Sequence, residues 1–222
     1  KKEKRLTTKT FFVFTTANRG RARASCDGGL LLIEACPPHR LMQWDTDFEF
    51  GIYQEEQFRF VEALPSEIHQ QLTVRLHGAY RHFQWSDTER WASRSPATKI
   101  DRGSTKIAKL MGQSRIIVHA YDSTGILEGL ALNIPTLCFW HGGLDHLLPE
   151  ALPYYQLLMD AGILLDSPES AAKRVVEIWD DIEGWWAQIA IQEARKIFCD
   201  QYARVSKNPV SDLKKILHGS SV

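Results

Sequence analysis

The sequence predicts an α/β fold with one open, doubly wound parallel sheet and helices on both of its faces. Strand-length apolar runs alternate with helical segments along the whole chain. Residues 114–140 have the order strand, tight turn, short helix and strand, and both strands are apolar throughout, as strands buried on two faces are. No repeat or low-complexity linker divides residues 1–222, so we expect a single domain with extra C-terminal helices.

The first half of the chain begins with residues 10–16, TFFVFTT, whose aromatic and β-branched residues predict the first central strand. Residues 30–35 are apolar, and their pattern leaves strand and helix open. Residues 55–64 carry apolar side chains at helical spacing, which predicts a helix ending near Pro65. Residues 71–77 alternate between apolar and polar side chains in the manner of a strand.

Two further helices and one strand follow. Ser86 and Ser104 are N-cap residue types and predict helices over residues 86–93 and 104–111. The short run 98–101 predicts a strand between them.

The C-terminal part of the chain is mainly helical by pattern. Residues 147–160 predict a helix and residues 163–165 a last short strand. Residues 167–180 open on the capping sequence SPE and predict a second helix. Residues 185–205 predict a long amphipathic helix, and residues 209–217 a short terminal one.

The composition is that of an ordinary globular protein, with 44% hydrophobic and 24% charged residues. Lys and Arg together number 27, as do Asp and Glu, so no net field favours a nucleic acid or an anionic membrane. No apolar run reaches the ~18 residues that span a bilayer. We predict no metal and a reducing, cytoplasmic location, because the cysteines show no metal-ligand spacing. These cysteines are Cys26, Cys36, Cys138 and Cys199.

The turn between the two long apolar strands contains residue types that suit an anion. Ser123 and Thr124 can cap a helix that begins near Gly125, whose first amides and positive dipole end would favour a phosphate. Glu128 lies one turn further along, where its carboxylate can accept the hydroxyls of a ribose. Gly125 and Gly129 leave one helix face bare, which indicates that something approaches closely.

Basic residues follow two other strands at the edge where open α/β sheets hold ligands. Arg19, Arg21 and Arg23 follow the first strand, and Arg75 and His77 share one face at the end of another. Guanidinium groups there favour a phosphorylated or carboxylated ligand. The alternatives are a solvated basic loop, a hydrogen-bonded bystander histidine and a capped turn of the kind common in α/β proteins that bind no nucleotide. The sequence predicts a nucleotide site here and leaves those alternatives open.

Four runs of the sequence carry a resemblance to a known family: YDSTGILEGLALNIPTLCFW, LPEALPYYQLLMDAGILLDSPESAA, IWDDIEGWW and EARKIFCDQYAR. They resemble a family of bacterial surface-carbohydrate transferases whose members look like GT-B glycosyltransferases. The similarity covers nearly the whole chain and is strongest from Gln71 onward. It implies two Rossmann-like domains facing across a cleft, of which this chain is the second. Since residue 1 is Lys, we also expect a preceding N-terminal domain that this chain lacks.

The resemblance also implies roles for particular residues. Four residues would bind the phosphates and the ribose of a nucleotide-sugar donor: Ser123, Thr124, Gly125 and Glu128. Arg75 and His77 would face the phosphates. The leaving diphosphate could be steadied by Arg19, Arg21 or Arg23. In such an enzyme positive charge and helix dipoles stabilise the leaving nucleotide, so we expect no metal or other cofactor.

The resemblance leaves the catalytic base open, because that group usually comes from the first domain. Asp122 and His141 are the nearby substitutes, and neither has a spacing that argues for base catalysis. We expect the donor-binding half of a glycosyltransferase of bacterial surface polysaccharide biosynthesis. It would act in the cytoplasm or peripherally at the inner membrane, on a carbohydrate or lipid-linked acceptor. The alternatives are a nucleotide-sugar epimerase or hydrolase of this fold and a non-catalytic nucleotide- or sugar-binding domain.

Overall fold

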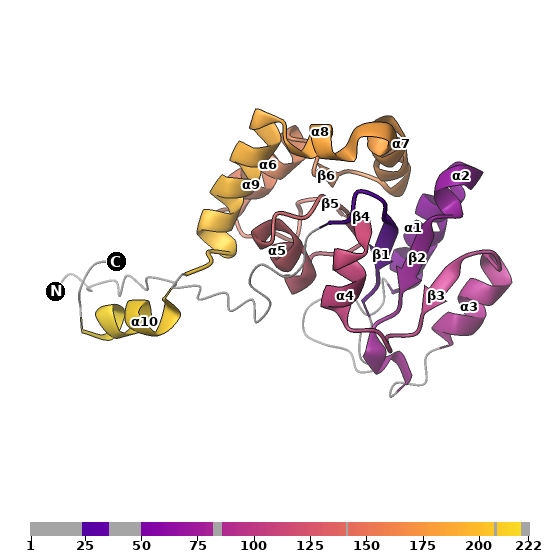
Figure 1. Cartoon of the computed structure of the whole chain (residues 1–222), viewed down its shortest axis with the longest axis horizontal. Coiled ribbons are helices and arrows are strands. Elements are labelled where there is room, and N and C mark those ends of the chain that lie inside the picture. Colours follow the sequence, from indigo (N-terminus) through magenta and orange to yellow (C-terminus); the bar gives the residue numbers. More distant parts are fainter. Residues whose placement is uncertain (1–23, 36–49, 82–85, 141, 207, 219–222) are drawn as a thin grey trace.

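The computed structural model describes residues 24–35, 50–81, 86–140, 142–206 and 208–218 (Figure 1). The predicted strand at residues 10–16 lies outside these ranges. Four residues of the expected site also lie outside them: Arg19, Arg21, Arg23 and His141. The roles expected for these segments stay predictions.

Six parallel strands form one sheet in the order β3-β2-β1-β4-β5-β6. Their bounds are β1 Gly29–Ile33, β2 Leu72–Arg75, β3 Lys99–Asp101, β4 Ser114–His119, β5 Thr136–Phe139 and β6 Leu164–Leu165. The order reverses between β1 and β4, which is the strand order of the Rossmann fold. The predicted α/β class with an open parallel sheet is therefore confirmed, and its switch point is at the ends of β1 and β4.

Helices cover both faces of the sheet (Figure 1). Their bounds are α1 Phe50–Glu62, α2 Ser66–His69, α3 Asp87–Arg94, α4 Ile107–Gly112, α5 Thr124–Ala131, α6 Leu152–Asp160, α7 Pro168–Ile178, α8 Ile182–Trp186, α9 Ile189–Tyr202 and α10 Pro209–Leu217. Two 3₁₀ turns accompany them, at Gly78–Arg81 and Trp179–Asp181.

The central strand β1 is buried on both faces, which resolves the ambiguity of residues 30–35 in favour of a strand. Leu30 and Leu32 enter a large core that also contains side chains of α1 and α7. Leu31 and Ile33 enter a separate, smaller core with Met111 of α4. Each fully buried leucine stabilises the fold by about 1.5–3 kcal/mol. Because a strand alternates its side chains, an all-apolar run is what two cores require.

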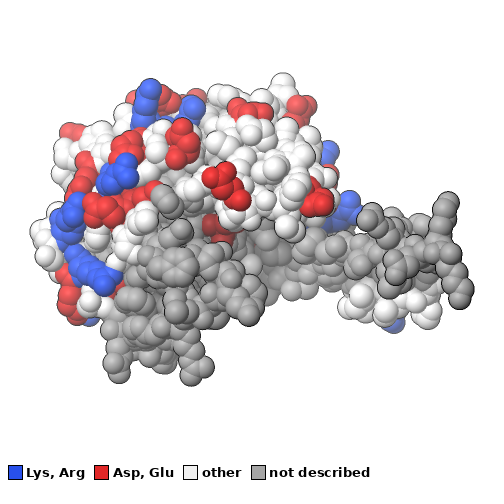
Figure 2. All heavy atoms as spheres, turned by 180° about the vertical axis from the view of Figure 1, so that it is seen from behind, with Lys and Arg blue, Asp and Glu red and all other residues white. Residues whose placement is uncertain are grey.

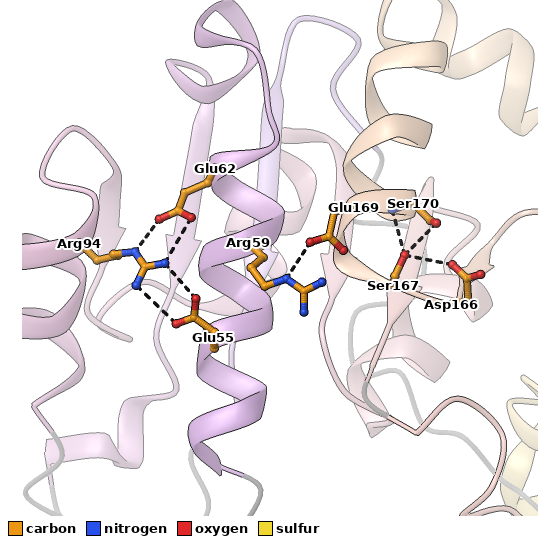
Figure 3. Close-up of polar contacts among 8 residues, drawn as sticks. All are labelled: Glu55, Arg59, Glu62, Arg94, Asp166, Ser167, Glu169 and Ser170. Atoms are coloured by element: carbon orange, nitrogen blue, oxygen red, sulfur yellow. Dashed lines mark hydrogen bonds and ion pairs between the residues drawn. The ribbon is translucent and has the colours of Figure 1, made fainter.

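Helix α1 is tied to its neighbours by exposed ion pairs, and we call α1, α3 and α7 the helical brace (Figure 3). Arg94 of α3 contacts Glu55 at 2.9 Å and Glu62 at 2.5 Å, both on α1. Arg59 of α1 contacts Glu169 of α7 at 2.7 Å. All of these side chains are exposed, so the pairs contribute little to stability, and burial of the apolar face of α1 dominates.

Several predicted helix bounds are wrong, and α1 begins at Phe50 instead of residue 55. Helix α4 begins at Ile107 with Lys106 as its N-cap, so Ser104 does not cap it. Residues 142–151 form a series of turns before α6 starts at Leu152. The long C-terminal helix divides into α8 and α9, because Gln188 takes an extended ψ of 137°. The carbonyl that this break exposes on Trp186 accepts a hydrogen bond from the side chain of Gln192 at 2.7 Å.

Charged side chains of both signs are interspersed over the described part of the face drawn in Figure 2. This mixture agrees with the equal totals of basic and acidic residues in the sequence. Among the described residues, none of the helices combines the length and the apolar character that crossing a bilayer requires.

Candidate functional site

The register of the sheet places Arg75 and His119 on either side of Ile33. Ile33 pairs with Arg75 of β2 and with His119 of β4. Side chains at one register position of a parallel sheet point to the same face. Ile33 belongs to the smaller core, which α4 covers. Arg75 and His119 therefore lie on that face, at the carboxyl edge and next to the switch point.

Helix α5 begins at Thr124, close to the predicted start, with Ser123 as its N-cap. The Ser123 hydroxyl accepts a hydrogen bond from the Gly125 N–H at 3.2 Å, and the Ser123 carbonyl accepts one from the Ile126 N–H at 3.1 Å. Ser123 thus satisfies two of the amides that a helix start normally leaves unpaired. The groups that this helix N-terminus can present to an anion are the positive end of the helix dipole and the hydroxyls of Ser123 and Thr124.

The glycines of α5 have a different explanation from the one that the sequence suggested. A Cβ at Gly125 would lie 2.6 Å from Cε1 of His119. A Cβ at Gly129 would lie 2.7 Å from the side chains of both Ile117 and Thr136. The bare face therefore lets α5 lie close to β4 and β5. What approaches this face closely is the protein's own sheet, so the two glycines are no evidence for a ligand.

Arg75 has a guanidinium group with unused hydrogen-bonding capacity. Its Nη1 donates to the Leu76 carbonyl at 3.3 Å, while its Nε is buried and has no hydrogen-bond partner among the described residues. Tyr121 connects this group to α5. Burial raises the pKa of Tyr121, and a hydrogen bond with Ser123 and the positive charge of Arg75 oppose that rise. Arg75 and Ser123, far apart in the sequence, therefore both affect the ionisation of the Tyr121 hydroxyl.

The strand predicted over residues 71–77 ends at Arg75, so His77 follows β2 instead of belonging to it. Burial and the positive charge of Arg75 lower the pKa of His77, so its ring is neutral at pH 7. Its Nδ1 accepts a hydrogen bond from the Ala79 N–H at 3.2 Å. A neutral imidazole that accepts at Nδ1 carries its hydrogen on Nε2. His77 can therefore donate one hydrogen bond to an anion held near Arg75.

Glu128 is half-buried on α5, one turn beyond Thr124. Burial raises the pKa of Glu128, and no hydrogen bond or ion pair holds its carboxylate within the part of the chain that the structure describes. A half-buried acid without a partner has acceptor capacity to spare. This is the property that a ribose-binding carboxylate needs.

Asp122 is held by two residues that the sequence argument did not select. The Tyr155 hydroxyl lies 2.9 Å from Oδ2 and 3.1 Å from Oδ1 of Asp122, and His146 Nε2 lies 3.3 Å from Oδ2. His146 comes from the turns that follow β5, and Tyr155 from α6. A histidine in a loop at the ligand edge is a signal that the sequence does contain. Tyr155 has no such signal, because its neighbours read only as a helix.

Glu34 is a buried carboxyl group that follows β1 directly, at the switch point. It is 5% exposed and accepts a hydrogen bond from the Trp91 indole at 2.7 Å. Burial, with a smaller contribution from the charge of Asp87, raises the pKa of Glu34 to about 8. Its raised pKa makes Glu34 a protonated acid at neutral pH, and the sequence shows only an acidic residue after an apolar run.

His119 is fully buried beneath the first turn of α5. Neither ring nitrogen has a hydrogen-bond partner among the described residues, and burial lowers the pKa of His119 to about 3. The ring is therefore neutral. No group of three or more metal-ligating side chains occurs among the described residues.

Among solved structures, the chain is similar to the wall teichoic acid polymerase TagF, with a TM-score of 0.44 and 16% sequence identity. The match covers 91% of this chain and 46% of that chain, so this chain spans about half the length of the polymerase. No curated protein matches the sequence.

A family model provides the assignment. The model described as "LIC12162 family transferase" matches residues 6–217, a range that includes the whole sheet and its carboxyl edge. The resemblance to a transferase family is thereby confirmed, and the chain belongs to the LIC12162 family of transferases.

Proposed function

We propose that this transferase is the donor-binding half of a glycosyltransferase that acts in surface polysaccharide biosynthesis. The observation that carries the proposal is the position of Arg75, which lies beside Ile33 and His119 at the carboxyl edge and next to the switch point of a Rossmann-ordered sheet. Family membership supports group transfer. The buried Nε of Arg75, which has no hydrogen-bond partner among the described residues, supports an anionic ligand, because a buried charged donor is costly until something accepts its hydrogen bond.

The proposed donor is a nucleoside diphosphate sugar. Its leaving diphosphate gains negative charge as the bond to the sugar breaks, and Arg75 and the positive end of the α5 dipole would stabilise that charge. His77 would add a neutral N–H donor. Glu128 would accept the ribose hydroxyls, since its carboxylate stands one turn beyond the phosphate position.

The proposal includes components beyond this chain. A preceding domain would bind a carbohydrate or lipid-linked acceptor and close over the donor. The site would work in the cytoplasm or peripherally at the inner membrane, where lipid-linked acceptors are located. Co-purification of an acceptor-binding domain with the donor-binding chain, and transfer that needs both, would test this part.

Ligand binding tests the donor site directly. The melting temperature of the intact gene product is measured with nucleoside mono- and diphosphates, since a ligand of the folded state raises it. We expect Arg75→Ala and Glu128→Ala to weaken the nucleotide that stabilises most by about 10- to 100-fold in calorimetry, because each removes a hydrogen bond to or from a charged group.

The control for this experiment is Arg59→Ala, which removes an exposed arginine of the helical brace. It should leave the affinity unchanged. The proposal fails if no nucleotide raises the melting temperature, and the site assignment fails if both edge variants bind as tightly as the wild type.

A further inference from the structure

A second polar group lies directly beside the proposed donor site, and we call it the Asp122 cluster. It consists of Asp122, His146, Tyr155 and Trp140. Asp122 immediately precedes the Ser123 N-cap of α5. The cluster therefore shares one short segment of chain with the proposed phosphate site, while its other members come from the residue after β5, the turns that follow it and α6.

The position of His146 is fixed by its neighbours. The Trp140 indole N–H donates to the Gly143 carbonyl at 2.6 Å, which draws the turns after β5 back onto the end of that strand. The rings of Trp140 and His146 meet edge to face, with centroids 6.0 Å apart. One residue after His146, the Leu147 N–H donates to the Leu144 carbonyl at 3.1 Å, so the backbone around His146 is also held by a hydrogen bond.

Asp122 is fixed as well. Tyr155 is buried, and its hydroxyl donates a hydrogen bond to the Asp122 carboxylate. Its ring packs edge to face on Trp140, with centroids 6.2 Å apart, and on Phe198, with centroids 5.1 Å apart. Burial and the negative charge of Asp122 raise the pKa of Tyr155, so Tyr155 stays a hydrogen-bond donor. The carboxylate then has one oxygen directed at His146.

This arrangement selects one form of the imidazole. His146 Nε2 faces Asp122 Oδ2, and a carboxylate accepts hydrogen bonds, so the ring hydrogen belongs on Nε2. Nδ1 is then left with a lone pair. The side chain of His146 is 41% exposed, so a substrate can reach the ring. An imidazole held by a carboxylate, with its second nitrogen unprotonated, is the arrangement of a general base.

We propose that His146 removes the proton from the attacking hydroxyl in the transfer reaction, with Asp122 and Tyr155 as positioning residues. This inference rests on the proposed function and deepens it. The hydroxyl proton passes to His146 Nδ1 while the oxygen forms a bond to the anomeric carbon of the sugar. The bond from that carbon to the diphosphate breaks, and its electron pair leaves with the nucleoside diphosphate. Asp122 stabilises the imidazolium that forms.

The alternative is that His146 and Asp122 only tether the turns after β5. His146→Gln separates the two roles, because a glutamine amide can still donate to Asp122 but cannot take up a proton. Asp122→Asn and Tyr155→Phe disturb the positioning of His146 without removing its ring. His218→Gln, at an exposed histidine beyond α10, is the matched control.

The test uses the intact gene product and a panel of uridine, cytidine, guanosine and thymidine diphosphate sugars, with water in place of the acceptor. We expect His146→Gln to lower the rate constant of nucleoside diphosphate release by about 100-fold or more, as loss of a general base does. Its Kd for the nucleoside diphosphate should stay at the wild-type value. Asp122→Asn should lower the rate less and remove the preference for the Nε2–H tautomer in ¹⁵N NMR of the ring.

Each other outcome has a distinct meaning. Release by His146→Gln at the wild-type rate, or a loss of rate matched by an equal loss of binding, overturns the role of His146 and leaves the donor site intact. A wild-type ring with its hydrogen on Nδ1 overturns the assignment of the base. If the wild type neither binds nor cleaves any donor, the proposed function itself fails, and the role of His146 fails with it.

Discussion

Two arginines of this protein differ in the partners that they have. On the helical brace, Arg94 contacts both Glu55 and Glu62. At the end of β2, Arg75 donates to one backbone carbonyl, and its buried Nε has no hydrogen-bond partner among the described residues. The first guanidinium is exposed and its charge is compensated within the protein. The second is partly buried and its charge is available. The comparison teaches that the number of arginines at an edge says less about binding than the partners each one already has.

The carboxyl edge and the brace also differ in the direction in which they shift the pKa of a glutamate. This difference leads to the largest expected effect on stability. The folded state holds Glu34 protonated until about pH 8, while the ordinary value is 4.5. Between these values the unfolded chain loses this proton and the native protein keeps it, so stability falls as pH rises, by up to about 1.4 kcal/mol per pH unit. Glu34→Gln imitates the protonated acid. Its advantage over the wild type should grow to about 3–5 kcal/mol between pH 5 and pH 8 in urea unfolding.

Glu62→Gln is the control from the brace. The hydrogen bond from Arg94 lowers the pKa of Glu62, which is the opposite direction, so that pair stabilises the fold above the ordinary pKa and loses its effect in acid. If the free energy of unfolding of Glu34→Gln and of the wild type changed equally with pH, Glu34 would not have the raised pKa on which this prediction depends.

The next effect concerns close packing at the edge. Gly129→Ala places a methyl group 2.7 Å from Ile117 and Thr136, and overpacking of this kind destabilises by about 1–3 kcal/mol. The higher helix propensity of alanine offsets up to about 1 kcal/mol of this loss, so the net effect should be destabilising. In the brace, an added Cβ at Gly51 would meet nothing within 4 Å among the described residues, so Gly51→Ala should stabilise by up to about 1 kcal/mol. Thermal unfolding of both variants checks the sign. A stabilising Gly129→Ala would show that α5 can move away from the sheet.

The smallest effect is expected for the ion pairs of the brace. A double-mutant cycle of Arg59→Ala and Glu169→Ala should give a coupling free energy of about 0.2–1 kcal/mol, which 1 M salt reduces, because both side chains are about half exposed. The free energy of unfolding is measured at low and high salt. A larger coupling that resists salt would mean that the brace, too, depends on specific charge partners.

The sequence predicts the elements whose pattern is local. The strand at β4, the Ser123 cap and the strand at β5 follow from an apolar run, a capping residue and a second apolar run. Arg75 lies at the end of β2 where the alternation of apolar and polar side chains predicts a strand, and alternation is legible in a sequence. These predictions need no knowledge of distant contacts.

What the sequence could not provide depends on how distant segments meet. The pairing of Asp122 with His146 requires the turns after β5 to fold back, which the Trp140 indole achieves through a backbone carbonyl. The sequence also does not show what approaches the glycines of α5, because their neighbours are His119 and Ile117 of another element. Glu34 gives no sign in the sequence of the burial that raises its pKa.

The pairing of Ile33 with both Arg75 and His119 has a consequence for how this chain can change in length. Removing one residue from β2 would rotate the guanidinium to the opposite face of the sheet, towards the core under α1. Insertions and deletions within β1, β2 and β4 should therefore be strongly selected against, whatever residue they add or remove. The turns at residues 142–151 carry no such constraint except around His146, and length variation among natural variants should concentrate there.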